Sequence, residues 1–384
     1  MPSAPLYFDY AATTPVDDRV IETMLACLGR HAHFGNPASS GHAHGQAARD
    51  RVEQARRQVA ERVRADPQAL IWTSGATESN NLALKGIAQG LDTPGHLITS
   101  QLEHKAVLDT VAELERQGWT VTRLAPDANG LIQPDRVDAA LRADTRLVSL
   151  MAVNNELGTV TDFAAIGERV RAHGALFHVD AAQAVGKVPI DLKATAVDLM
   201  SFSAHKVYGP KGIGALYVGP RARALMRAQI HGGGHEQGLR SGTLATHQIV
   251  GMGSAFTIAG QPGDNDYQRT ERLARRLREG LLGLPGITLN GCPTQRIPHT
   301  LNLCIEAQGF NGAALAGELA LSTTSACNSA SNAPSHVLLA LGLDEARARR
   351  SVRVSIGRFT TESEIDQAIE TFRRVLNMAS TALW

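Results

Sequence analysis

Lys206 lies where a predicted strand, ending at Ser203, runs into a turn made by Gly209 and Pro210. A lysine at the end of a buried strand is costly unless its charge is paired or removed. A Schiff base removes the ammonium charge, and Ser203 and His205 nearby can donate hydrogen bonds to a phosphate. The pattern predicts a lysine that binds a carbonyl cofactor, or else an ordinary surface lysine beside a turn.

Three further polar side chains follow predicted strands. Asp180 ends the strand 176–180, Gln183 comes three residues later, and His104 opens a helix directly after another strand. In an open parallel sheet, ligands bind at the carboxyl ends of the strands. Asp180 is therefore a candidate partner for a protonated pyridine nitrogen, Gln183 for a phenolic oxygen, and His104 for a flat ring with which it exchanges protons. The alternatives are a helix-capping aspartate and a structural histidine.

The segment 73–80 joins a predicted strand to a predicted helix and contains Gly75, Ala76 and Thr77. Free backbone amides at a helix start, together with the Thr77 hydroxyl, make a cradle for phosphate. The alternative is an ordinary helix N-cap. The spacing of a Walker loop is absent. The glycine-rich run 231–243 resembles a second tight loop shaped around a phosphate.

Four cysteines are scattered along the chain without a CxxC pair, which argues against a disulfide scaffold or a zinc site. Cys27 and Cys304 lie in apolar runs typical of a core, and Cys292 lies in a turn. Cys327 lies in a small, polar, turn-prone stretch and is the best candidate for an accessible thiol. The alternative is a loop cysteine without a role.

Two histidine pairs also attract attention because HxH spacing places both rings on one face of a strand. The surrounding glycine, proline and serine residues favour an irregular loop, and no acidic or cysteine ligand is nearby. We therefore predict no metal site there or in the His231–His235 segment. The pairs are His31 with His33 and His42 with His44.

The elements that position these residues alternate between short apolar runs and amphipathic runs, which predicts an α/β fold with a largely parallel sheet and helices on both faces. The predicted strands are 70–73, 97–100, 121–124, 147–153, 176–180, 199–203 and 214–218, and the predicted helices include 76–88, 104–116 and 163–173. After a polar break at 261–266 the pattern changes to a helix at 267–282 and strands near 287–289, 300–305 and 352–356. We expect an N-terminal arm (1–15) that packs on the small domain, a large domain (16–260) and a small C-terminal α/β domain (261–384).

Composition excludes several function classes. The 384 residues are 43% hydrophobic and 20% charged, with a formal net charge of +1. This is typical of a folded globular protein and provides no basic field for nucleic acid phosphates. No apolar stretch reaches the roughly 18 residues that a membrane span needs, and the N-terminus lacks the pattern of a signal peptide. We expect a cytoplasmic protein that binds neither membranes nor nucleic acid directly.

Taken together, the motifs resemble a pyridoxal-phosphate-dependent cysteine desulfurase of the NifS/IscS type, within the class V aminotransferase family. The resemblance covers nearly the whole chain. The motifs that carry it are 8–15, 34–39, 73–79, 103–105, 154–156, 178–180, 203–206, 240–243, 325–327 and 351–355.

The resemblance implies a role for each matching residue. The cofactor is bound covalently by Lys206, with Asp180 at the ring nitrogen, Gln183 at the phenolic oxygen and His104 stacked on the ring. Further roles are assigned as follows: phosphate binding by Ala76, Thr77, Ser203 and His205, with Thr243 from the other subunit of a homodimer; substrate carboxylate binding by Asn155 and Arg353; and persulfide formation by Cys327.

The implied reaction converts L-cysteine to L-alanine and a persulfide on Cys327, whose sulfur passes to an acceptor protein in iron–sulfur cluster assembly, tRNA thiolation or DNA phosphorothioation. Two features depart from the family: Thr324 replaces a loop glycine in a segment one residue shorter, and the chain ends at Trp384 without the tail used to dock an iron–sulfur scaffold. The alternatives are a selenocysteine lyase, a class V aminotransferase, or a non-catalytic subunit of a sulfur-transfer complex.

Overall fold

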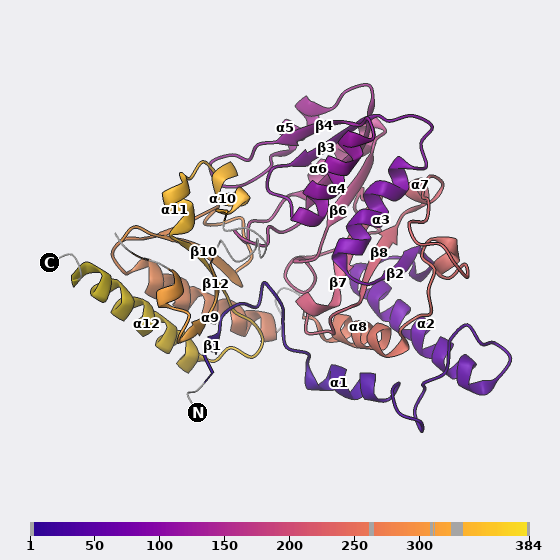
Figure 1. Cartoon of the computed structure of the whole chain (residues 1–384), viewed down its shortest axis with the longest axis horizontal. Coiled ribbons are helices and arrows are strands. Elements are labelled where there is room, and N and C mark those ends of the chain that lie inside the picture. Colours follow the sequence, from indigo (N-terminus) through magenta and orange to yellow (C-terminus); the bar gives the residue numbers. More distant parts are fainter. Residues whose placement is uncertain (1–3, 261–264, 308–309, 311, 324–332, 382–384) are drawn as a thin grey trace.

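The computed structural model describes residues 4–260, 265–307, 310, 312–323 and 333–381. Its largest sheet has the strand order β2-β8-β7-β6-β5-β3-β4 (Figure 1). The neighbouring strands are parallel except at β8, which runs antiparallel to β2 and β7. The expected α/β fold with a mostly parallel seven-stranded sheet is thereby confirmed. The strands are β2 (Leu70–Thr73), β3 (His96–Ser100), β4 (Thr120–Leu124), β5 (Thr145–Met151), β6 (Leu176–Asp180), β7 (Leu199–Ser203) and β8 (Gly214–Val218).

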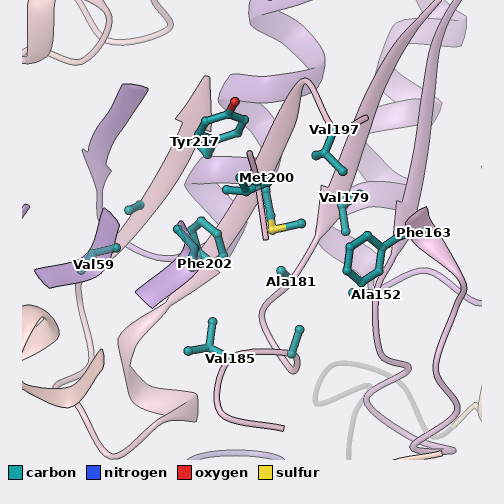
Figure 2. Packing of buried hydrophobic residues seen from close by; sticks show 14 of the residues in the cluster. Val59, Ala152, Phe163, Val179, Ala181, Val185, Val197, Met200, Phe202 and Tyr217 are labelled. Atoms are coloured by element: carbon teal, nitrogen blue, oxygen red, sulfur yellow. The ribbon is translucent and has the colours of Figure 1, made fainter. Parts of the chain in front are cut away.

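Both faces of this sheet are buried, which explains why its central strands are continuous apolar runs rather than alternating ones. Along β7, Met200 and Phe202 pack beside Val179 of β6 on one face (Figure 2), while Leu199 joins a cluster on the opposite face. Two groups of helices cover the two faces. The first face packs against α2 (Ala43–Val63), α6 (Phe163–His173) and α8 (Thr246–Ile258), and the second against α3 (Ala76–Ala88), α4 (Lys105–Arg116) and α7 (Pro220–Arg223).

The C-terminal part forms a separate antiparallel sheet with the order β12-β13-β10-β9. Leu273 and Leu277 of α9 and Phe372 of α12 are buried in the cluster that covers this sheet. The elements are β9 (Ile287–Leu289), β10 (Thr300–Ile305), β12 (Ser322–Thr323), β13 (Ser351–Ser355), α9 (Asn265–Leu282), α10 (His336–Ala340), α11 (Glu345–Arg349) and α12 (Glu362–Thr381).

The start of the chain packs on this C-terminal part. Strand β1 (Leu6–Tyr7) pairs in parallel with β11 (Leu319–Ala320), and Phe8 is buried in the same cluster as α9 and α12. In Figure 1 the N-terminal segment, which contains β1, passes β12 before it reaches α1 (Asp18–Leu25) in the other part of the molecule. The domain boundaries near residues 15 and 260 stay predictions.

The sequence analysis named no helix at α1, α2 or α5 (Pro134–Ala140). Helix α2 begins directly after His42, whose Nδ1 accepts a hydrogen bond of 3.1 Å from the Gly45 backbone N–H. The second histidine pair is therefore divided between a helix cap and the first helical turn. In the described ranges, no group of three or more histidine, cysteine, aspartate or glutamate side chains is arranged to hold a metal ion. Within the same ranges, no helix combines the length and apolarity needed to cross a bilayer.

Candidate active site

A cavity of about 700 Å³ lies at the carboxyl ends of the central strands, between the large sheet, the N-terminal arm and the C-terminal part. This is the position where parallel sheets bind ligands. The structure brings all but one of the predicted site residues that it describes to the wall of this cavity. Those lining it are Ala76, Thr77, His104, Asn155, Asp180, Gln183, Ser203, His205, Lys206 and Arg353.

Lys206 ends a single 3-10 turn, Ala204–Lys206, that follows β7. Its Nζ donates hydrogen bonds to the backbone oxygens of Ala11, at 2.6 Å, and Ala12, at 2.7 Å. The N-terminal arm thus holds the amine at the cavity wall. Lys105 and Lys211 also line the cavity.

Asp180 ends β6, the strand beside β7 in the sheet. Its Oδ2 accepts a hydrogen bond of 2.7 Å from the Asn80 side chain, and its Oδ1 accepts one of 3.0 Å from the Ala182 backbone N–H. Both carboxylate oxygens are therefore held in fixed directions. Asn80 lies in the second turn of α3, and its position shows that this helix supports the carboxylate as well as forming the edge of the cavity.

His104 is the N-cap of α4 and lines the cavity. Its Nδ1 accepts a hydrogen bond of 3.1 Å from the Ala106 backbone N–H, so the proton of the neutral ring belongs on Nε2. Burial lowers the pKa of His104, and the charge of Lys206 acts in the same direction against Asp180. A neutral imidazole is available to stack on a ring and exchange a proton.

The opposite end of the cavity is formed by the start of α3. Gly75 caps this helix with a φ of 154°, a conformation that favours glycine, and no side chain caps the first amides. Thr77, Ser203 and His205 also line the cavity. Burial lowers the pKa of His205 to about 4, with the charges of Lys206 and Lys211 contributing. A neutral histidine and a helix N-terminus suit a phosphate.

Arg353 on β13 and Asn155 also line the cavity. Arg353 donates from one terminal nitrogen to the Asn155 backbone oxygen, at 2.9 Å, and from the other to Asp9 Oδ1, at 2.8 Å. Its Nε is buried without a hydrogen-bond partner. Because a guanidinium has five N–H groups, Arg353 keeps donors for a carboxylate while Asp9 holds the group in place.

One predicted site residue that the structure describes, Thr243, does not line this cavity. Thr243 lies beyond it, in the loop that Arg240 ties to Glu78 through an ion pair of 2.8 Å. Cys327 and the loop position Thr324 lie outside the described residues.

The sequence analysis assigned no role to several polar residues around the cavity. Asp9 pairs with Arg353, Asn80 with Asp180, and Lys187 with Gln183. Asp9 lies in the motif 8–15, and Asn80 lies four residues after Ala76, on the same helix face. The sequence thus offered a reason to consider Asp9 and Asn80, but only the tertiary structure shows which residue each of them contacts.

The protonation of His178 allows a test, through the pH dependence of stability, of whether this side chain is buried in a hydrogen-bond network. It lies on β6 between the hydroxyls of Ser149 and Ser201, at 2.8 and 2.9 Å. Burial lowers the pKa of His178 to about 4. As the pH falls below 6.5, the unfolded chain therefore binds a proton that the folded chain excludes until about pH 4, and stability is lost.

We expect His178→Asn to reduce this loss. Between pH 7 and pH 5.5, the unfolding free energy of the parent should fall by about 1 kcal/mol more than that of the variant. Urea unfolding at the two pH values measures the difference, and any constant cost of the substitution cancels. Equal losses in both proteins would show that His178 binds its proton equally well in the folded and the unfolded chain, so that burial does not lower its pKa.

The geometry fits pyridoxal phosphate. An amine, a fixed carboxylate, a neutral histidine and an anion cradle surround one cavity, and these groups match the aldehyde, ring nitrogen, flat face and phosphate of that cofactor. The model for aminotransferase class-V matches residues 6–368. The chain belongs to this family.

Relatives within the family have names that match the predicted resemblance. A curated relative from Azotobacter vinelandii (strain DJ / ATCC BAA-1303), "Cysteine desulfurase IscS", is 57% identical over 366 residues, covering 95% of this chain and 91% of the relative. A solved structure described as "NIFS-LIKE PROTEIN" has a TM-score of 0.89 at 35% identity, covering 97% of this chain and 100% of the other. Another, "SspA in complex with cysteine", has a TM-score of 0.83 at 41% identity, covering 92% and 99%. The resemblance to NifS/IscS-type cysteine desulfurases is confirmed.

Proposed function

We propose that this chain is a pyridoxal-phosphate-dependent cysteine desulfurase, a sulfurtransferase that takes L-cysteine as its substrate. The observation that carries the proposal is the placement of Lys206 and the fixed carboxylate of Asp180 on neighbouring strand ends, in one cavity with His104. Relatives at 57% identity bear the name cysteine desulfurase.

The cofactor, when bound, supplies an aldehyde carbon that combines with amines and a pyridinium ring that accepts electrons. Lys206 would hold it covalently, and Asp180 would keep a proton on its ring nitrogen. Gln183 donates to the phenolic oxygen. Phosphate binding is assigned to Ala76, Thr77, Ser203 and His205.

The substrate is oriented by its carboxylate, which Arg353 and Asn155 bind. His104, through Nε2, holds or moves a proton near the reacting carbon. The Cys327 thiolate attacks the sulfur of L-cysteine, forming an S–S bond as the Cβ–S bond breaks. The carbon gains a proton, so that L-cysteine and the Cys327 thiol become L-alanine and a Cys327 persulfide.

The proposed assembly is a homodimer, in which Thr243 of each protomer binds the phosphate in the other protomer's site. The position of Thr243 away from the cavity of its own chain supports this assignment. The persulfide sulfur then passes to an acceptor protein. Identity to proteins named IscS favours iron–sulfur assembly over tRNA thiolation or DNA phosphorothioation.

The experiment that tests the proposed function is a product assay on the purified holoenzyme. With L-cysteine and a thiol reductant, we expect alanine and sulfide in equal amounts. A protein that contains the cofactor but releases no alanine from L-cysteine would contradict the assignment. Alanine from L-selenocysteine alone would identify a selenocysteine lyase instead.

Substrate binding is tested by Arg353→Lys. Lysine retains the charge but cannot reproduce the forked contact to a carboxylate. The loss of a charge-assisted hydrogen bond costs about 1.5–3 kcal/mol, so we expect KM for L-cysteine to rise roughly tenfold to a hundredfold with a smaller change in kcat.

The control for this prediction is Arg349→Lys, which changes a partly exposed arginine paired with Glu345 on α11. It should leave both kinetic constants unchanged. If Arg353→Lys also leaves KM unchanged, Arg353 does not bind the substrate carboxylate.

A further inference from the structure

Lys187 is linked to the catalytic lysine through a chain of hydrogen bonds. Its Nζ donates to Oε1 of Gln183 at 2.8 Å, and Nε2 of Gln183 donates to the Ala11 backbone oxygen at 2.8 Å. The same oxygen accepts a hydrogen bond of 2.6 Å from Lys206 Nζ. Gln183 lines the active-site cavity, whereas Lys187 lies behind it.

The surroundings of Lys187 are not those of a lysine that forms an ion pair. A separate cavity of about 40 Å³ is lined by Lys187, Lys206 and the half-buried His299. Burial lowers the pKa of Lys187 to about 7, with the charges of Lys206 and Arg353 acting in the same direction. Within the described ranges no carboxylate pairs with it, and Asp266 on the same cavity pairs with arginines instead.

Burying an amine without a compensating partner is costly, so a lysine in this position is expected to have a specific role. The hydrogen bond from Lys187 to Gln183 indicates what that role is. The two ends of a glutamine amide have nearly the same shape, so their orientation is decided by their hydrogen-bond partners. The Ala11 carbonyl accepts only from the NH2 group, and Lys187 donates to the oxygen.

We propose that Lys187 is a positioning residue that fixes the amide of Gln183, with its oxygen turned away from the active site and its NH2 group held at the cavity wall. In this orientation Gln183 donates a hydrogen bond to an anionic oxygen of a ligand. A rotated amide would present its own oxygen there and repel that ligand. The inference rests on the proposed function, in which the ligand atom is the phenolic oxygen of the cofactor.

The role does not depend on the charge of Lys187. An ammonium and a neutral amine both carry N–H groups, so each can donate to Gln183 Oε1. The role requires a side chain of about this length at position 187 that ends in a hydrogen-bond donor. Arginine also provides donors at the end of a long chain, and methionine provides similar length without any donor.

The test compares Lys187→Met, Lys187→Arg and the exposed-lysine control Lys193→Met as holoenzymes. For Lys187→Met we expect a shifted visible absorption maximum of the bound cofactor and a cofactor Kd weakened roughly fivefold to tenfold, the effect of one lost hydrogen bond. We also expect kcat to fall while KM for L-cysteine stays constant. Lys187→Arg should recover most of the spectrum, and Lys193→Met should match the parent.

A double-mutant comparison distinguishes this role from general support of the fold. If Lys187 acts through Gln183, Lys187→Met should add no further spectral shift in a Gln183→Leu background. An unchanged spectrum and Kd in Lys187→Met, or fully additive shifts in the double variant, would overturn the inference. A parent protein that releases no alanine from L-cysteine would instead contradict the proposed function. If Lys187→Met does not fold, an unrecovered spectrum in folded Lys187→Arg would equally overturn the inference.

Discussion

Replacement of Cys327 by serine is expected to leave a yellow protein that still binds L-cysteine but releases alanine at least about a thousandfold more slowly, because loss of a nucleophile can cost as much as roughly a millionfold in kcat. Serine preserves the size and polarity of the side chain but cannot accept sulfur to form a persulfide. Steady-state alanine release and the absorption spectrum of the cofactor measure the two effects separately.

The other three cysteines provide matched controls, because all are buried. Burial raises the pKa of Cys27 and Cys304, which makes both weak nucleophiles. Cys292 is the more demanding control: although burial opposes ionisation, hydrogen bonds from Gln295 and Thr294 lower its pKa. Single alanine substitutions at these positions should leave turnover largely intact. Full activity in Cys327→Ser would assign the nucleophile elsewhere.

Replacement of Lys206 by alanine is expected to abolish covalent binding of pyridoxal phosphate and to reduce turnover on the order of a thousandfold or more. The amine is held at the cavity wall by the Ala11 and Ala12 backbone oxygens. Loss of the visible absorption band and of the borohydride-reduced adduct measures the effect.

Lys105 and Lys211 are the controls for this result, because both also line the cavity. Lys105→Ala and Lys211→Ala should retain the adduct on Lys206. An adduct that maps to Lys211 in the parent protein would show that Lys206 is not the covalent attachment site.

The sheet could be predicted from the sequence because burial on both faces produces a distinct pattern. Strands such as 199–203 are apolar and short, and glycine or a polar turn follows them. Helix α2 gave no such signal: its buried face includes the small residues Ala48, Ala55 and Ala60 among many arginines and glutamines. Its burial depends on α8 and on the buried ion pair between Arg56 and Glu236, at 2.8 Å, which no local pattern indicates.

The candidate site, like the fold, could be predicted only in part from the sequence. Lys206, Asp180 and His104 could be named because each follows a strand, where a parallel sheet places its ligand-binding side chains. Their supporting residues could not, because each contact joins distant parts of the chain. Asp9 reaches Arg353 across 344 positions, and Asn80 reaches Asp180 across 100.

The most direct test of the central claim is a single-turnover experiment on the holoenzyme with sulfur-labelled L-cysteine and no reductant. Mass spectrometry of the digested protein should find one labelled sulfur on the Cys327 peptide for each alanine released. Lys206→Ala should show neither product. Alanine without labelled sulfur on Cys327, or labelled sulfur on Cys292 instead, would contradict the account.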